Sequence, residues 1–314
     1  MLAIERLKVT DRLTMLAPLG LRFWDEVSAR IVGDGLSVTA YPIDNPARRV
    51  EAFANRSGVY VLRNLPGMRE VENGAGDDAF WNSITQKRAF VIEVVDAERR
   101  FLPFMMKVNL PERGVFAWQD PTGSSPPSPA KGVPLYSSAS RQAPPSMAVA
   151  RAELREWRPG ANHEGNPAAW AVLEARSSGR LLARGFADEQ GRVALIFSYP
   201  EPVTHTLGSP PGGSPPPASA PQLRDQEWTI EVAARYARLS PAPAGDRPSF
   251  ADLSDILTQP PARLWADSER GRPLSEANLQ FGRELVLRSR DFTADPIEGA
   301  PKSVLFITPA GSPP

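Results

Sequence analysis

The chain has 314 residues, with 36 basic and 36 acidic side chains, 34 prolines, two histidines and no cysteine. An apolar share of 41%, with 23 glycines besides, is close to that of globular proteins and excludes wholesale disorder. The lack of cysteine excludes disulfides and thiolate chemistry, and the zero net charge argues against a nucleic-acid or membrane-surface role because no global field attracts phosphate groups.

The N-terminal segment is charged. The first twenty residues contain Glu5, Arg6, Lys8 and Asp11, so they lack the apolar stretch of a signal peptide. The longest apolar runs, such as 193–197, are far shorter than the roughly 18 residues that span a bilayer. We therefore expect a protein that is cytoplasmic at synthesis and does not insert into a membrane.

Short two-periodic runs, rich in β-branched and aromatic residues and bounded by Gly, Pro, Asn or Asp, predict strands. In chain order they are 35–41, 58–62, 90–95, 193–197 and 228–232.

Two helices are predicted. A short one begins near Asp77 or Asp78 and runs to residue 84, with a surface turn as the alternative. A longer one covers about 249–259, where Ser249 is a candidate cap and two prolines follow the last turn. Its apolar face consists of Leu253, Ile256 and Leu257.

Proline clusters divide the chain. Residues 120–146 combine Pro, Ser and Gly with almost no large apolar side chains, which is typical of an extended linker. The expected domains are therefore 1–119 and 147–314. A second cluster at 200–221 predicts a long exposed loop inside the second domain, which then ends in the helix and further strands.

An internal repeat appears at an offset of 133, where residues 37–62 lie over 170–195 without a gap. Both copies contain F-A-[ND]-x-x-G before an apolar run, so that Asn55 and Gly58 fall on Asp188 and Gly191. Asn or Asp starts such a turn by bonding its own backbone, and Gly supplies the positive φ that closes it. We interpret this as two copies of one antiparallel β-unit, and the alternative is two unrelated segments with similar turns. The expected fold class is all-β, with two β-sandwich domains.

The sequence predicts no catalytic, cofactor-binding or metal-binding residue. His163 and His205 stand alone in loops, and no ligand spacing surrounds them. The pairs Asp77–Asp78 and Asp188–Glu189 are candidates for acid–base hydrolysis, but helix capping by Asp78 and the repeated turn at Asp188 explain them structurally. The glycines at 33–35 and 74–76 lack the context of a phosphate loop.

Tryptophans and arginine pairs are the candidate contact residues. Trp24, Trp170 and Trp228 lie in strand-like runs and are expected in the core. Trp81, Trp118 and Trp157 lie beside loops, where a partner surface is the alternative to burial. The pairs 48–49 and 99–100 are expected to be solvated, with bridges to acidic neighbours in an assembly as the alternative.

The amino-acid sequence of the first copy resembles that of the carboxypeptidase-regulatory, or transthyretin-like, β-sandwich. The resemblance rests on WDEVSARIVGDGLSVTAYP, ANRSGVYVLRNLPG and FVIEVVD, fits residues 21–110 well and fits 147–239 less well, because LPG is missing there. It implies a scaffolding or interaction module that brings no catalytic residues.

The order of segments along the whole chain is similar to that of proteins of contractile injection systems, which are phage-tail-like particles. It runs from LRFWDEVSARIVGDGLSVTAYP through LPERGVFAW, AWAVLEA, RGFADEQGRVALIF and QEWTIEV to LTQPPARLWADSERGRPL. The resemblance implies a non-enzymatic adaptor at the cap or tail-terminator end. Its partners would be sheath, tube or cap subunits in a ring-like assembly, and the particle would be released from the cell. The alternative is an extracytoplasmic or surface module that binds glycan or peptide.

Overall fold

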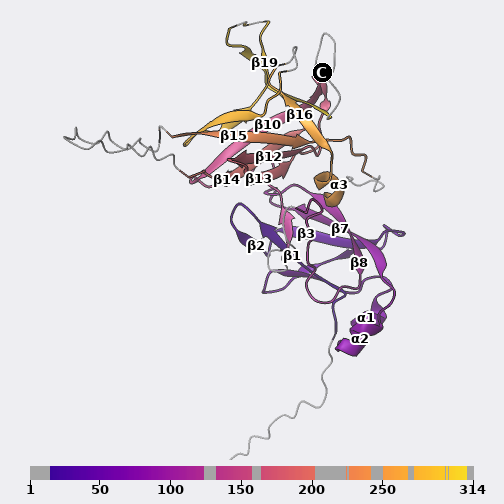
Figure 1. The fold of residues 1–314 in the computed structure, drawn as a ribbon. Coiled ribbons are helices and arrows are strands. Elements are labelled where there is room, and N and C mark those ends of the chain that lie inside the picture. Colours follow the sequence, from indigo (N-terminus) through magenta and orange to yellow (C-terminus); the bar gives the residue numbers. More distant parts are fainter. Residues whose placement is uncertain are drawn as a thin grey trace, which may run out of the picture.

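A computed structural model describes residues 15–123, 132–157, 164–201, 224, 226–241, 250–267, 272–293, 295 and 297–309. Strands dominate this part of the chain, and its helices are short, which confirms the predicted all-β class (Figure 1). We call strands β1–β9 the N-terminal unit and strands β10–β21 the C-terminal unit. Each unit contains a large hydrophobic core, and the core of the N-terminal unit also includes residues of the C-terminal unit.

The N-terminal unit consists of two sheets. One has the order β2-β1-β6-β5, with β9 beside β1, and the other has the order β4-β3-β7-β8. The strands of the first sheet are β1 (Leu19–Asp25), β2 (Arg30–Val32), β5 (Phe53–Ala54), β6 (Val59–Leu62) and β9 (Val133–Leu135). Those of the second are β3 (Leu36–Pro42), β4 (Val50–Glu51), β7 (Arg88–Asp96) and β8 (Phe104–Leu110).

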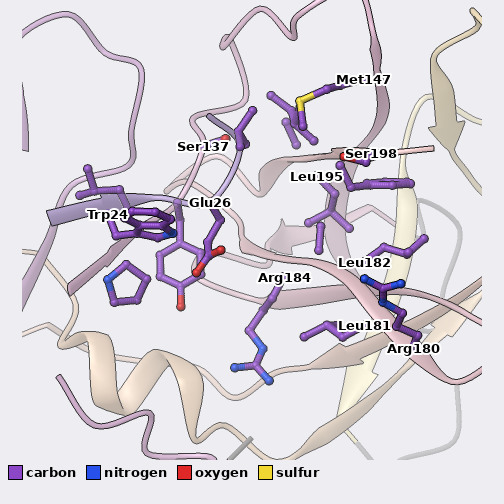
Figure 2. Close-up of a pocket in the computed structure, with 18 of the residues that line it drawn as sticks. Trp24, Glu26, Ser137, Met147, Arg180, Leu181, Leu182, Arg184, Leu195 and Ser198 are labelled. Carbon is purple, nitrogen blue, oxygen red and sulfur yellow. The ribbon is translucent and has the colours of Figure 1, made fainter. Parts of the chain in front are cut away.

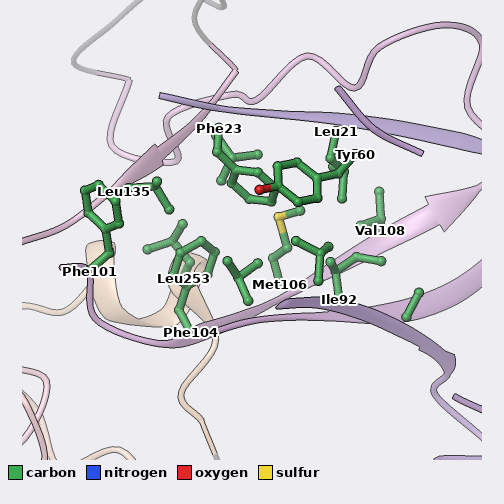
Figure 3. Packing of buried hydrophobic residues seen from close by; sticks show 14 of the residues in the cluster. Leu21, Phe23, Tyr60, Ile92, Phe101, Phe104, Met106, Val108, Leu135 and Leu253 are labelled. Carbon is green, nitrogen blue, oxygen red and sulfur yellow. The ribbon is translucent and has the colours of Figure 1, made fainter. Parts of the chain in front are cut away.

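The two sheets of the N-terminal unit face each other across its core. Phe23 and Tyr60 of the first sheet point toward Ile92, Phe104 and Met106 of the second, and all five are at most 2% exposed (Figure 3). Alternate residues of a strand point to opposite faces, so β1, β7 and β8 each supply a buried row from every second position.

The C-terminal unit is built on one large sheet with the order β11-β10-β21-β16-β15-β12-β13, in which β14 and β18 also pair with β10, and β17 pairs with β15. Its strands are β10 (Met147–Trp157), β11 (Glu164–Pro167), β12 (Val172–Ser177), β13 (Arg180–Phe186), β14 (Arg192–Ser198), β15 (Glu227–Arg235), β16 (Pro261–Trp265), β17 (Glu276–Gln280), β18 (Leu285–Leu287) and β21 (Leu305–Pro309). A separate ribbon pairs β19 (Arg290–Asp291) with β20 (Ala300–Pro301).

The helices depart from the expectation in their caps. In α2 (Asp78–Ser83) the capping residue is Asp77, which accepts a hydrogen bond from the N–H of Phe80 at 2.7 Å, and not Asp78. In α3 (Leu253–Leu257) Asp252 is the cap, while Ser249 lies outside the described residues. The predicted apolar face of α3 is confirmed as buried. Helix α1 (Arg69–Glu72) was not predicted.

Two segments that the expected boundaries place outside the first domain pack in the N-terminal unit. Residues 120–146 are not wholly a linker, because β9 pairs in parallel with β1 and Val133, Leu135 and Tyr136 are buried in the N-terminal core. Helix α3, expected in the second domain, packs on the same core next to β8 (Figure 1). Both segments are apolar enough to fill a core that the first 119 residues leave open.

The pairing scheme of the N-terminal unit recurs in the C-terminal unit. Strand β3 pairs with β4 and β7, and β12 pairs with β13 and β15 in the same way. Strand β1 pairs antiparallel with β6 and β2 and parallel with β9, whereas β10 pairs antiparallel with β14 and β11 and parallel with β21. The repeat seen in the sequence therefore extends to the order in which strands pair.

Candidate functional site: the interunit cleft

The repeated turn has the same geometry in both units. The side-chain oxygen of Asn55 accepts hydrogen bonds from the N–H groups of Ser57 and Val59, at 2.9 and 3.0 Å. Asp188 accepts from Gln190 and Arg192, at 3.0 and 2.8 Å. The closing glycines, Gly58 and Gly191, have φ of 70° and 79°, as the sequence predicts.

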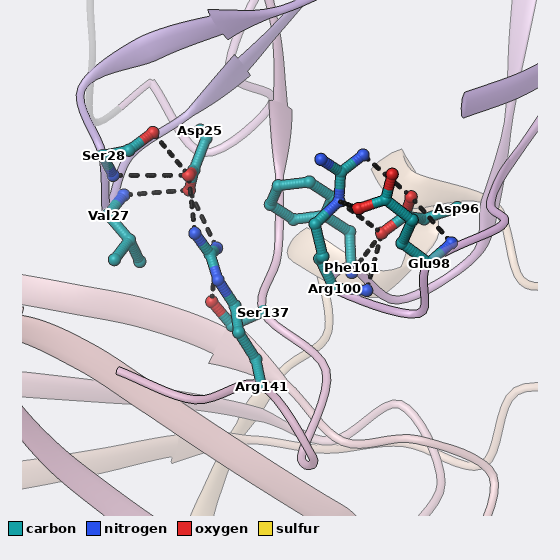
Figure 4. Close-up of polar contacts among 9 residues, drawn as sticks. All are labelled: Asp25, Val27, Ser28, Asp96, Glu98, Arg100, Phe101, Ser137 and Arg141. Carbon is teal, nitrogen blue, oxygen red and sulfur yellow. Dashed lines mark hydrogen bonds and ion pairs between the residues drawn. The ribbon is translucent and has the colours of Figure 1, made fainter. Parts of the chain in front are cut away.

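An ion pair between Arg141 and Asp25, which we call the latch, fixes the segment between the two units to the N-terminal unit. Arg141, which follows β9, donates from Nη1 and Nη2 to the two carboxylate oxygens of Asp25, at 2.9 and 2.6 Å (Figure 4). Asp25 also accepts from the N–H groups of Val27 and Ser28. Burial raises the pKa of Asp25, but the hydrogen bonds from Arg141 and Ser28 outweigh it, so that the pKa lies below its ordinary value.

The same segment is held from the other side. Arg151 of β10 donates to the backbone oxygens of Ala139 and Arg141. The chain that links the units is therefore fixed at its C-terminal end by an ion pair to the N-terminal unit and by hydrogen bonds to the C-terminal unit.

Beside this latch lies a cleft of about 740 Å³, which we call the interunit cleft (Figure 2). Its walls come from both units: the end of β1 and the segment around β9 on one side, and β13 and β14 on the other. The lining is mixed, with aromatic side chains, the aliphatic residues of β13 and β14, and a few charged groups.

One wall of the cleft is held by a buried charge network. The Arg184 guanidinium of β13 lies 2.9 Å from Glu174 and 3.3 Å from Asp120, with Arg184 only 10% exposed. Burial raises the pKa of Glu174, but hydrogen bonds and charges from Arg176 and Arg184 lower it overall. Because Arg184 is satisfied by these two carboxylates, it positions the wall and is not left for a ligand.

Two strand edges border the cleft without pairing to each other. Within the described residues, β13 pairs only with β12 and β14 pairs only with β10. Residues 180–184 of β13 and 194–198 of β14 line the cleft. In the N-terminal unit the corresponding edge is occupied, because β5 pairs with β6 there.

The candidate acid pairs have structural partners and lie in different units. Asp78 forms an exposed ion pair with Arg113, and Asp188 bonds its own turn and Arg192. The structure brings neither pair to the cleft. The two histidines, His163 and His205, lie outside the described residues, so the predicted absence of a role for them stays a prediction.

The tryptophans divide differently from the expectation. Trp228 is buried as predicted, whereas Trp24 and Trp170 are half-buried. Trp24 and Trp118 line the interunit cleft, and of these two the sequence offered a partner surface as an alternative to burial only for Trp118.

Two arginines of the pairs that were expected to be solvated form ion pairs with carboxylates. Arg49 binds Glu93 with 15% of its side chain exposed, and Arg100 binds Asp96 with 31% exposed. The prediction of solvation is wrong for both, because each has a carboxylate on β7 within reach.

Comparison of the chain with protein-family models, curated proteins and solved structures gives no match. In the ranges that the structure describes, no helix is both long and apolar enough to cross a membrane. Within those same ranges, no three acidic or histidine side chains lie together as metal ligands would. The site is therefore interpreted from its own geometry.

Proposed function

We propose that this chain is a non-enzymatic structural adaptor that joins subunits of a phage-tail-like contractile injection particle, at the cap or tail-terminator end. The whole-chain resemblance supports the particle, and the likeness of residues 21–110 to transthyretin-like sandwiches supports a scaffolding module. An adaptor of this kind acts through shape: it presents strand edges and loop ends at fixed positions to its neighbours.

The observation that carries the proposal is the joining of two β-units into one body. The N-terminal core includes Val172 and Phe186 from the C-terminal unit and the apolar face of α3. Tyr136 contacts Phe186 with ring centroids 5.1 Å apart, and the Arg141–Asp25 latch lies close by. A shared core with a buried ion pair holds the two units at one relative orientation, which an adaptor between rings requires.

Deletion of the gene tests the proposal. Particles purified from the deletion strain should have an altered or missing end structure in electron micrographs, and expression of the full chain should restore it. Particles from the complemented strain should contain the chain at a fixed ratio to the end subunits. Wild-type particle ends in the deletion strain would contradict the adaptor role.

The interunit cleft favours a second candidate, an extracytoplasmic or surface module that binds a glycan or a peptide. A cleft of about 740 Å³ with aromatic lining is within the size range of ligand sites. A glycan array and a thermal-shift screen test this candidate, with a saturable shift as the expected result. No glycan binder in either screen, together with a defective particle end in the deletion strain, would favour the adaptor.

A further inference from the structure

We infer that the interunit cleft binds an extended peptide segment of a neighbouring protein, which adds as a strand to the free edge of β14. The inference deepens the adaptor role and rests on it only for the source of the segment. It names the chemistry of that partner: an extended backbone with apolar side chains on one face and charged residues of opposite sign at its two ends.

The first support is the unpaired backbone in the cleft. Residues Ala194, Leu195, Ile196 and Phe197 of β14 are 2–6% exposed, yet the strand pairs on one edge only within the described residues. Buried N–H and C=O groups need hydrogen-bond partners, and a free strand edge is a template for another strand. Peptides that add to such edges gain affinity from main-chain hydrogen bonds.

The second support is the paired copy of the same edge. In the N-terminal unit the residues just before the repeated turn form β5, and Phe53 and Ala54 pair with Val61 and Tyr60 of β6. In the C-terminal unit the strand before the turn is β13. It pairs with β12 up to its last residue, Phe186, which lies opposite Val172. In the second unit no described residue pairs with β14 at the position that β5 fills in the first.

The third support is the charge at the two sides of the cleft. Glu26 and Arg180 line it, are exposed, and lie on opposite sides in Figure 2, with Arg184 between them. Neither Glu26 nor Arg180 has an ion-pair partner among the residues that the structure describes. An extended segment with a basic residue at one end and an acidic residue at the other complements them, and Leu181, which is 37% exposed, offers an apolar contact between these ends.

A synthetic peptide tests the inference on the full chain. The probe has lysine first, glutamate last and alternating valine and threonine between them, and carries a fluorophore for anisotropy. We expect saturable binding and slower hydrogen exchange of the amides of residues 193–198. N-methylation of alternate amides in one of the two possible patterns should weaken binding by about tenfold or more, because it removes the donors that face β14.

Two substitutions with a matched control locate the site. Leu181→Glu should weaken probe binding, whereas Val286→Glu, at a position that is 46% exposed on β18 and outside the cleft, should leave it unchanged. Glu26→Lys should weaken binding of the probe and strengthen binding of a second peptide in which glutamate replaces the lysine. Circular dichroism of each variant establishes that it is folded.

The outcomes separate this inference from the adaptor proposal. No saturable binding up to millimolar probe, tolerance of both N-methylation patterns, or binding of a glycan without the peptide would overturn strand addition. None of these results depends on the particle, and a wild-type particle end in the deletion strain would leave them unaffected.

Discussion

Several buried carboxylates of this chain lie beside arginines. Asp25, Asp96 and Glu174 each accept hydrogen bonds from a guanidinium, and the pKa of each is held below its ordinary value in spite of burial. The local contacts at Asn55 and Asp188 are readable from the sequence because donor and acceptor are two to four residues apart. The Asp25–Arg141 pair was not, because 116 residues separate its members.

The latch should be costly to break from the arginine side. Arg141→Gln leaves the Asp25 carboxylate, 4% exposed, without its charged partner, and we expect a loss of about 3 kcal/mol in the free energy of unfolding. Lys87→Gln, which removes an ion pair with 50% and 36% of its side chains exposed, should cost less than about 1 kcal/mol. Urea unfolding of both variants measures the difference, and equal losses would contradict the structural role of the latch.

Acid should weaken the fold through Asp96. Burial raises the pKa of Asp96, but Arg100 and backbone N–H groups lower it further, so the net shift is downward from 3.8 (Figure 4). A lowered pKa in the folded state stabilises the protein above about pH 3.8, and this stabilisation is lost as the pH falls through the folded value.

Asp96→Asn should therefore lower stability at neutral pH, by on the order of 2 kcal/mol, and flatten its decline below about pH 4. Asp44→Asn, at an exposed position, is the control. Urea midpoints across this range provide the measurement, and an unchanged pH profile of Asp96→Asn would count against the pair.

At the scale of elements, the residue types of β10 favour a helix, whereas their alternation along the sequence favours a strand. Residues 147–157 are rich in Ala, Leu, Glu and Arg, which favour helices, and no strand was predicted there. The burial of β10 nevertheless alternates at every position, with three alanines, Leu154 and Glu156 inward. This two-residue period was the only feature of the segment that indicated a strand. Pairing of β10 with several neighbouring strands overrides the helix propensity of its residues.

The closing glycines of the repeated turn should differ in their tolerance of a side chain. At Gly191 an added Cβ would lie 2.2 Å from the backbone oxygen of Leu154, and at Gly58 it would lie 3.0 Å from the side chain of Ile31. At Gly282, also with positive φ, the space is open within 4 Å.

Substitution by alanine should thus cost about 1 kcal/mol at Gly282, more at Gly58 and more than about 3 kcal/mol at Gly191. Thermal unfolding of the three variants gives the order. A Gly191→Ala protein as stable as Gly282→Ala would show that the turn is not held against β10.

At the scale of the whole molecule, the sequence indicated two β-units but not which residues the two cores share. Two apolar segments, β9 and α3, complete the N-terminal core from positions beyond the expected boundary at residue 119. Proline content predicted exposure for 120–146, and the short apolar run at 133–136 within it was too brief to stand out. Contacts between distant segments carry no local pattern, so the interunit cleft was not predicted either.

The shared core predicts that the two units unfold together. Leu253→Ala in α3 removes a fully buried side chain and should cost about 3 kcal/mol. Amides of β8 in the N-terminal unit should then exchange faster, although β8 lies far upstream in the sequence. Asp255→Ala, at an exposed position of the same helix, should have little effect. Two separate calorimetric transitions, of which only one responds to Leu253→Ala, would contradict a shared core.

The position of α3 in the sequence also determines when the N-terminal core can be completed during synthesis. Leu257, which closes the N-terminal core, leaves the ribosome later than Leu135 by the time needed to make roughly 120 residues. At 5–20 residues per second this interval is roughly 6–24 s. During that time the apolar surface under α3 has no cover, so the N-terminal unit matures only when most of the polypeptide has been synthesised.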